Sequence, residues 1–124
     1  MSVPNVFCYP IKVISVYDGD SLTAQVDVGF GWKKEKLKCR LYGIDTPEIR
    51  GSSDEEKEMA RAAKQALWAM LENAGRVVMH SMTKPDKYGR CLVKLWADDI
   101  DVSQRMIELG HARAYDGGAK QPWV

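Results

Sequence analysis

The fold of this chain is constrained most strongly by the order in which strand-like and helix-like hydrophobic patterns follow one another along the sequence. Three segments with strand-like alternation come first, a long stretch with helical spacing follows, and two more strand-like segments precede a short helical one. A parallel α/β sheet would alternate strands with helices throughout, so this grouping favours an α+β, mainly β domain. It predicts a five-stranded Greek-key barrel of the OB type with one long and one short helix. The strands are expected at residues 7–17, 21–28, 36–44, 76–82 and 90–97.

Both predicted helices begin with an N-terminal signal. Ser53 followed by Glu56 forms a capping box, and Asp101 with Gln104 marks the start of the shorter helix in the same way. Gly75 is expected to end the long helix. The apolar residues that recur at helical spacing in the long helix are Met59, Ala63, Ala66, Leu67, Met70, Leu71 and Ala74.

Length and composition indicate one domain, residues 1–124, since 45% hydrophobic residues suffice for a single core. No apolar run reaches the length needed to cross a bilayer. The first residues lack the basic and apolar stretches of a secretory leader, so we expect a cytoplasmic protein of cellular or viral origin. Cys8, Cys39 and Cys91 match no zinc spacing and are expected to be reduced thiols. A net charge of +1 means that any nucleic-acid surface must concentrate its positive charge locally.

Four polar features lie around the predicted strands, and each is weak alone. Residues 18–20, Asp-Gly-Asp, are typical of a hairpin turn in which Gly19 can supply a positive φ. Asp-Thr-Pro-Glu at 45–48 is compatible with a simple loop cap, and Lys-Tyr-Gly-Arg at 87–90 resembles any turn that enters a strand. The last feature is a basic stretch that would ordinarily be a solvated face, made of Lys33, Lys34, Lys36, Lys38 and Arg40.

Together these features match the requirements of phosphodiester hydrolysis. The substrate is an anion that repels an attacking oxygen, so its charge must be neutralised before the reaction. A hard cation held by carboxylate and carbonyl oxygens neutralises part of that charge. Arginine can bridge two phosphate oxygens as lysine cannot. A further carboxylate can take a proton from water or orient it. The chain therefore contains every group that such a site needs.

Three motifs, VYDGDS at 16–21, RLYGIDTPE at 40–48 and KYGR at 87–90, resemble the signature stretches of the staphylococcal nuclease family. They occur in the family's order with suitable separations, and the resemblance spans roughly residues 11–115. It implies an OB-type barrel with one active site and a single bound Ca²⁺ ion. The implied activity is calcium-dependent hydrolysis of DNA and RNA that breaks the bond from phosphorus to the 5′ oxygen. The products would carry 3′-phosphate and 5′-hydroxyl ends.

The resemblance implies a role for each matching position. Asp20 and Asp45, with the backbone carbonyl of Thr46, are expected to bind the cation. Asp18 is expected to act near it through water. Glu48 matches the family's general base, which either deprotonates or positions the attacking water. The remaining matches are the phosphate-clamping catalytic residues Arg40 and Arg90 and the substrate-binding residues Lys87, Tyr88 and Tyr115.

The chain departs from the family's secreted type member, which carries a leader, a strongly basic surface and a third, C-terminal helix. The hairpin at 29–38 is long and basic, and we expect it to supply substrate contacts, with Trp32 exposed. DNA and RNA are the expected partners, with no membrane, no obligate protein partner and a monomeric chain. The alternative is an inactive nuclease-like OB module that binds nucleic acid without cutting it. Against this alternative, the chain retains Asp20, Arg40, Asp45, Glu48 and Arg90.

Overall fold

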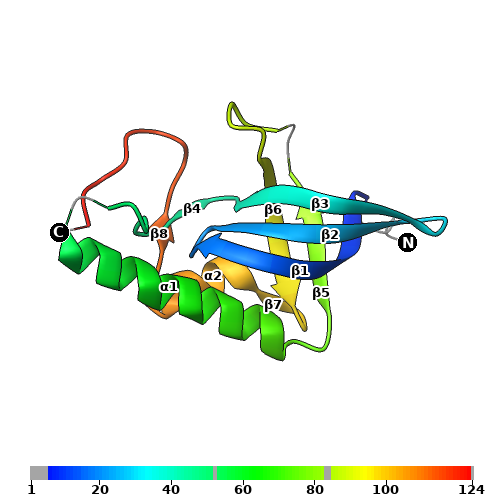
Figure 1. Cartoon of the computed structure of the whole chain (residues 1–124), viewed down its shortest axis with the longest axis horizontal. Coiled ribbons are helices and arrows are strands. Elements are labelled where there is room, and N and C mark those ends of the chain that lie inside the picture. The colour runs from blue at the N-terminus through cyan, green and yellow to red at the C-terminus, as the bar shows by residue number, and fades with distance from the viewer. Residues whose placement is uncertain (1–5, 52, 83–84, 124) are drawn as a thin grey trace, which may run out of the picture.

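A computed structural model describes residues 6–51, 53–82 and 85–123. In it, β1 pairs antiparallel with β2 and β5, β2 with β3, and β5 with β6. A parallel pairing of β3 with β6 closes the ring, which confirms the predicted OB-type barrel (Figure 1). The five barrel strands are β1 (Cys8–Asp18), β2 (Ser21–Gly29), β3 (Trp32–Leu41), β5 (Val77–Ser81) and β6 (Cys91–Ala97).

Three strands of two residues and two helices complete the described part. The short strands β4 (Ile44–Asp45) and β8 (Arg113–Ala114) pair with each other, and β7 (Ile100–Asp101) pairs with β6. The long helix α1 (Asp54–Asn73) runs along the barrel and packs on β1, and the short helix α2 (Val102–Glu108) lies beside it (Figure 1). Neither helix is long and apolar enough to cross a membrane.

The predicted N-terminal signals position both helices. The Ser53 hydroxyl accepts the Glu56 amide at 3.1 Å, and the Asp101 carboxylate accepts the Gln104 amide at 3.1 Å. Each contact satisfies an amide that a helix start leaves without an intrahelical acceptor. The long helix ends at Asn73, before Gly75, whose amide donates instead to the Asp98 carboxylate at 2.8 Å.

The strand β3 begins earlier and ends earlier than the prediction of 36–44. The turn from β2 is completed within Gly29, Phe30 and Gly31, whose φ angles are 86°, 59° and 76°, so pairing resumes already at Trp32. At the other end, Gly43 has a φ of 85° and separates β3 from β4. Val28 continues the apolar alternation of Leu22, Ala24 and Val26, which predicts a buried position, but it is 39% exposed because the hairpin extends beyond the core.

Gly19 does not adopt the positive φ that a glycine could supply in this turn. A close approach explains the glycine instead. A Cβ atom built at Gly19 would lie 2.8 Å from the Ala63 Cβ and 3.2 Å from the Thr46 Cγ2. The missing side chain therefore lets the turn between β1 and β2 pack directly on α1 and on the segment after β4.

Candidate functional site

The turn between β1 and β2 positions Asp20 beside β3. Ser21 lies opposite Arg40 in the strand register, and the Leu41 amide donates to the Asp20 carbonyl at 2.8 Å. The Asp20 side chain is buried, and its Oδ1 accepts the Ser21 hydroxyl at 2.9 Å. The barrel pairing therefore fixes this carboxylate at the end of two strands.

Arg40 is buried beside these carboxylates, although the alternation of β3 placed it among solvated lysines. Its Nη1 donates to Asp20 Oδ2 at 2.6 Å, and its Nη2 donates to the Ile44 carbonyl at 3.2 Å. The same Nη2 lies 3.8 Å from Asp45 Oδ1. A buried guanidinium requires such partners, because an uncompensated charge in the interior is costly. Arg40 is therefore buried, and not solvated like the lysines of the same stretch, because of neighbouring acids that the strand pattern cannot show.

Asp45 ends β4, and Thr46 follows it in the interior. They are 3% and 1% exposed. Asp45 Oδ1 lies at ion-pair distance from Arg40 and 3.3 Å from Lys120 Nζ, but neither contact has hydrogen-bond geometry. The Thr46 hydroxyl has no hydrogen-bond partner among the described residues. Buried polar atoms are normally satisfied, so these two oxygens are exceptions that require an explanation.

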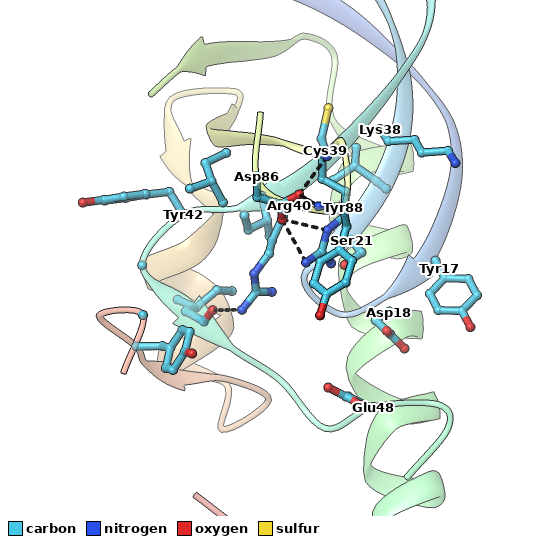
Figure 2. Close-up of a pocket in the computed structure, with 18 of the residues that line it drawn as sticks. Tyr17, Asp18, Ser21, Lys38, Cys39, Arg40, Tyr42, Glu48, Asp86 and Tyr88 are labelled. Carbon is cyan, nitrogen blue, oxygen red and sulfur yellow. Dashed lines mark hydrogen bonds and ion pairs between the residues drawn. The ribbon is translucent and has the colours of Figure 1, made fainter. Parts of the chain in front are cut away.

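Asp18 and Glu48 lie close together on one side of the pocket (Figure 2). Asp18 Oδ1 accepts the Ile49 amide at 3.0 Å, which holds the segment that carries Glu48 against the turn. Burial raises the pKa of Asp18 despite that hydrogen bond, and the negative charges of Asp20 and Glu48 raise it further. The Glu48 side chain is 57% exposed. It is thus the most accessible carboxylate of this group.

The loop before β6 is organised by Asp86. Its Oδ1 accepts the Tyr88 and Arg90 amides at 2.9 Å, and its Oδ2 accepts Arg90 Nε at 3.0 Å. Arg90 Nη2 is also 3.0 Å from Oδ2. Desolvation acts to raise the pKa of Asp86, but the Arg90 and Tyr88 hydrogen bonds and the Arg90 charge lower it overall. Asp86 therefore fixes the direction of the Arg90 guanidinium.

The segment after β8 forms another wall of the site. The Tyr115 amide donates to the Gly43 carbonyl at 2.9 Å, and its hydroxyl donates to the Gly118 carbonyl at 2.6 Å. The Tyr115 ring lies 5.8 Å from the Arg40 guanidinium and 5.9 Å from Lys120 Nζ. Lys120 Nζ also donates to Glu48 Oε1 at 3.1 Å. This lysine consequently joins the C-terminal segment to the acids of the site.

These elements surround one open pocket of about 1160 Å³ (Figure 2). Asp20, Asp45 and Thr46 are buried and are not among its lining residues. Asp45 instead lines a smaller pocket of about 370 Å³, which shares Gly43, Tyr115 and Asp116 with the first. The structure thus brings the predicted site residues together, with the predicted cation ligands Asp20 and Asp45 beside Arg40. The predicted residues that line the pocket are Asp18, Arg40, Glu48, Lys87, Tyr88, Arg90 and Tyr115.

The predicted cation ligands supply the oxygen donors that Ca²⁺ prefers. Asp20 and Asp45 both lie within ion-pair distance of Arg40, so the two carboxylates flank the same guanidinium. Asp45 Oδ1 and the Thr46 hydroxyl still lack hydrogen bonds. Across residues 6–51, 53–82 and 85–123, no group of three or more His, Cys, Asp or Glu side chains could hold a metal ion. The donor set fits a hard cation if carbonyl or water oxygens complete its coordination.

Two site residues were missed by sequence reasoning, Asp86 and Lys120. Asp86 had a usable signal, because aspartate at the start of a turn commonly accepts amides a few residues further on. Lys120 had none. It lies far along the chain from Asp45 and Glu48, and only the return of the C-terminal segment to the barrel brings them together.

Comparisons with known proteins bear on the family and fold of the chain. The family described as staphylococcal nuclease homologues matches residues 38–122. A probable staphylococcal-like nuclease of Oryza sativa subsp. japonica is 33% identical over 85 residues, covering 66% of this chain and 23% of the relative. A probable endonuclease of Yarrowia lipolytica is 30% identical, covering 86% and 55%. An uncharacterized protein of Methanocaldococcus jannaschii is 29% identical, covering 84% and 58%. The chain thus matches between 23% and 58% of these relatives' lengths.

Proposed function

Because the chain belongs to the staphylococcal nuclease homologue family, we propose that it is a calcium-dependent nuclease that hydrolyses phosphodiester bonds of DNA and RNA. One observation carries the proposal. Arg40, Arg90 and Glu48 line a single pocket, and Arg40 ion-pairs there with Asp20 and Asp45. This arrangement supports a site in which the two arginines bind phosphate, Glu48 activates water, and Asp20 and Asp45 bind the cation. The proposed products carry 3′-phosphate and 5′-hydroxyl ends.

The two arginines are proposed to bind the reacting phosphate from different sides of the pocket. Arg40 comes from β3, and Arg90 comes from the loop that Asp86 holds. Their guanidinium groups can each donate two parallel hydrogen bonds to phosphate oxygens and stabilise the charge that grows in the transition state. When bound at Asp20, Asp45 and Thr46, Ca²⁺ would supply further positive charge beside the phosphate.

Glu48 is proposed to orient or deprotonate the attacking water. It is the exposed carboxylate of the site, whereas Asp18 is tied to the Ile49 amide. A base must be accessible to the solvent molecule that it activates, which favours Glu48 over Asp18. Before substrate arrives, Lys120 holds the Glu48 carboxylate at 3.1 Å.

The aromatic groups around the pocket are proposed to bind the nucleoside. Tyr88 is 68% exposed, and its ring lies 5.2 Å from Lys87 Nζ and 5.3 Å from the Arg90 guanidinium. Tyr115 faces Arg40 across the pocket. Aromatic faces beside cations suit a base attached to a phosphate.

The direct test is digestion of labelled single-stranded DNA, duplex DNA and RNA in Ca²⁺, in Mg²⁺ and in chelator. We expect fragments in Ca²⁺ and none in chelator. Their 5′ ends should accept a phosphate from a polynucleotide kinase without prior dephosphorylation, and their 3′ ends should block a polymerase until a phosphatase is added. Bound but uncut nucleic acid under every metal condition would instead identify an inactive binding module.

Asp86→Ala is expected to lower turnover by about tenfold to a hundredfold, because it releases the guanidinium of Arg90 from its fixed direction. Asp86→Asn keeps an oxygen that can accept the loop amides, so it should retain more activity than the alanine variant. Steady-state kinetics on a short oligonucleotide separates turnover from the Michaelis constant. Equal turnover in the parent and Asp86→Ala proteins would show that Arg90 does not need this partner.

Lys120→Met is expected to tighten Ca²⁺ binding by about two- to fivefold, the range set by an exposed ion pair. The ammonium lies 3.3 Å from Asp45 Oδ1 and 3.1 Å from Glu48 Oε1, so it competes with a cation for these acids. Calorimetric titration with Ca²⁺ measures the change. Lys38→Met is the matched control, since Lys38 lines the same pocket and makes no ion pair among the described residues. Weaker Ca²⁺ binding by Lys120→Met would contradict the competition.

A further inference from the structure

The hairpin of β2 and β3 carries its aromatic residues into solvent. Figure 1 shows its turn projecting beyond the rest of the barrel. Phe30 at the turn is 93% exposed, and Trp32 at the start of β3 is 71% exposed. Their ring centroids lie 6.2 Å apart with the planes tilted by 56°, so the rings do not cover each other. We refer to residues 28–38 as the hairpin arm.

The conformation of the turn makes Phe30 unusual. Its φ of 59° lies in the left-handed region, between Gly29 and Gly31, which have φ angles of 86° and 76°. Aromatic residues rarely adopt this region, whereas glycine does so without steric cost. The turn therefore presents a large ring at a position where glycine would suit the backbone better. This points to a role for the ring outside the fold.

The arm also concentrates positive charge. It contains Lys33, Lys34, Lys36 and Lys38 with Glu35 as its only acid, although the whole chain has a net charge of +1. None of the ion pairs in the described part of the chain uses these lysines. Their charges are consequently available to an anionic ligand.

The arm is continuous with the proposed active site. Lys38 lines the pocket, and Arg40 follows it on the same strand. From Trp32 to Arg40 the strand extends about 26 Å at about 3.3 Å per residue. A stacked strand rises about 3.4 Å per nucleotide and an extended single strand up to about twice that, so this length corresponds to about four to eight nucleotides. A trinucleotide that occupies the pocket would therefore not reach the exposed rings.

We propose that the hairpin arm binds single-stranded nucleic acid and leads it into the pocket. The lysines contact phosphates, and Phe30 and Trp32 stack on bases. Single strands fit better than duplexes, because only unpaired bases offer their faces freely to aromatic rings. An anionic membrane would also attract aromatic and lysine side chains, but the continuity with a phosphate-binding pocket favours nucleic acid. The inference rests on the proposed function in taking nucleic acid as the ligand of that pocket.

The test measures binding of fluorescent dT12 and dT3 in chelator, so that cleavage does not interfere. Phe30→Ala/Trp32→Ala is expected to weaken dT12 binding at least about tenfold, since each stacked base contributes substantially to affinity. Binding of dT3 should change less than about twofold, because dT3 is too short to reach the rings. The matched variant Phe30→Tyr/Trp32→Tyr retains two rings and should bind dT12 like the parent.

Phe30→Gly separates folding from binding. Glycine suits a φ of 59°, so the melting temperature should stay equal or rise while dT12 affinity falls. Log affinity falls as log salt rises. Replacing Lys33, Lys34 and Lys36 with glutamine should make this dependence less steep, reducing the magnitude of the negative slope by up to about 2.

Three results would overturn the proposal. These are unchanged dT12 affinity in the double alanine variant, equal losses for dT12 and dT3, and loss of binding to anionic phospholipid vesicles with dT12 binding retained. The last result would assign the arm to a membrane surface. Failure of the proposed function looks different. A parent protein that cuts no nucleic acid in any metal, yet binds dT12 through the rings, would support the proposal for the hairpin arm and contradict the proposed nuclease function.

Discussion

Glu48→Gln is expected to slow hydrolysis of a single-stranded oligonucleotide by at least about a hundredfold. A positioned general base contributes on the order of 10²–10⁴ to a rate, and glutamine keeps the shape of the side chain while losing its basicity. The effect should appear in turnover, because Glu48 is proposed to act on water, and the Michaelis constant should change little. Single-turnover cleavage at saturating Ca²⁺ measures it.

The exposure of Glu48 makes this variant informative. The side chain is 57% exposed, and its one side-chain partner among the described residues is Lys120, so its replacement should not disturb the fold. Lys120→Met is the control for the lost ion pair, since it breaks the same contact and leaves the carboxylate in place. If Glu48→Gln cleaved as fast as the parent protein, Glu48 would not be the base and the mechanism would be wrong.

Arg40→Ala is expected to lower both turnover and stability. Loss of one preorganised charge-stabilising donor costs roughly 10²–10³ in rate. Removing the guanidinium also leaves Asp20 without its ion-pair partner and Asp45 with Lys120 alone. Breaking a buried pair in this way costs about 3–5 kcal/mol in the free energy of unfolding. Urea denaturation and single-turnover cleavage measure the two effects separately.

Calcium provides a check on the Arg40 account. If Asp20 and Asp45 bind the cation, Ca²⁺ should restore part of the stability that Arg40→Ala loses, because a ligand that binds the folded state stabilises it. The cleavage rate should remain low, since Ca²⁺ does not replace a phosphate-binding guanidinium. A variant with parental stability and turnover would show that Arg40 is one more surface charge.

The barrel could be predicted from sequence because its signals are local. Strand alternation, the caps of Ser53 and Asp101 and the order of the elements are read within short windows, and the structure bears them out. The errors arose where distant segments meet. Gly19 is required by its contact with Ala63. The apolar alternation of β2 indicates a buried Val28, but Val28 is exposed because the hairpin extends beyond the hydrophobic core.

The site was predictable to a different degree. The motifs identified residues that the fold does gather, and the pocket holds the predicted arginines and Glu48. Periodicity could not show that Arg40 is buried among Asp20 and Asp45, because that depends on the turn before β2 and on β4. Lys120 was invisible for the same reason, since its partners come from a distant part of the chain.

A crystal structure of the Glu48→Gln protein with Ca²⁺ and a short single-stranded oligonucleotide tests the central claim most directly. We predict one Ca²⁺ ion bound by carboxylate oxygens of Asp20 and Asp45, and one phosphate in contact with Arg40 and Arg90. An ion bound at other residues, or a phosphate held away from both arginines, would contradict the account.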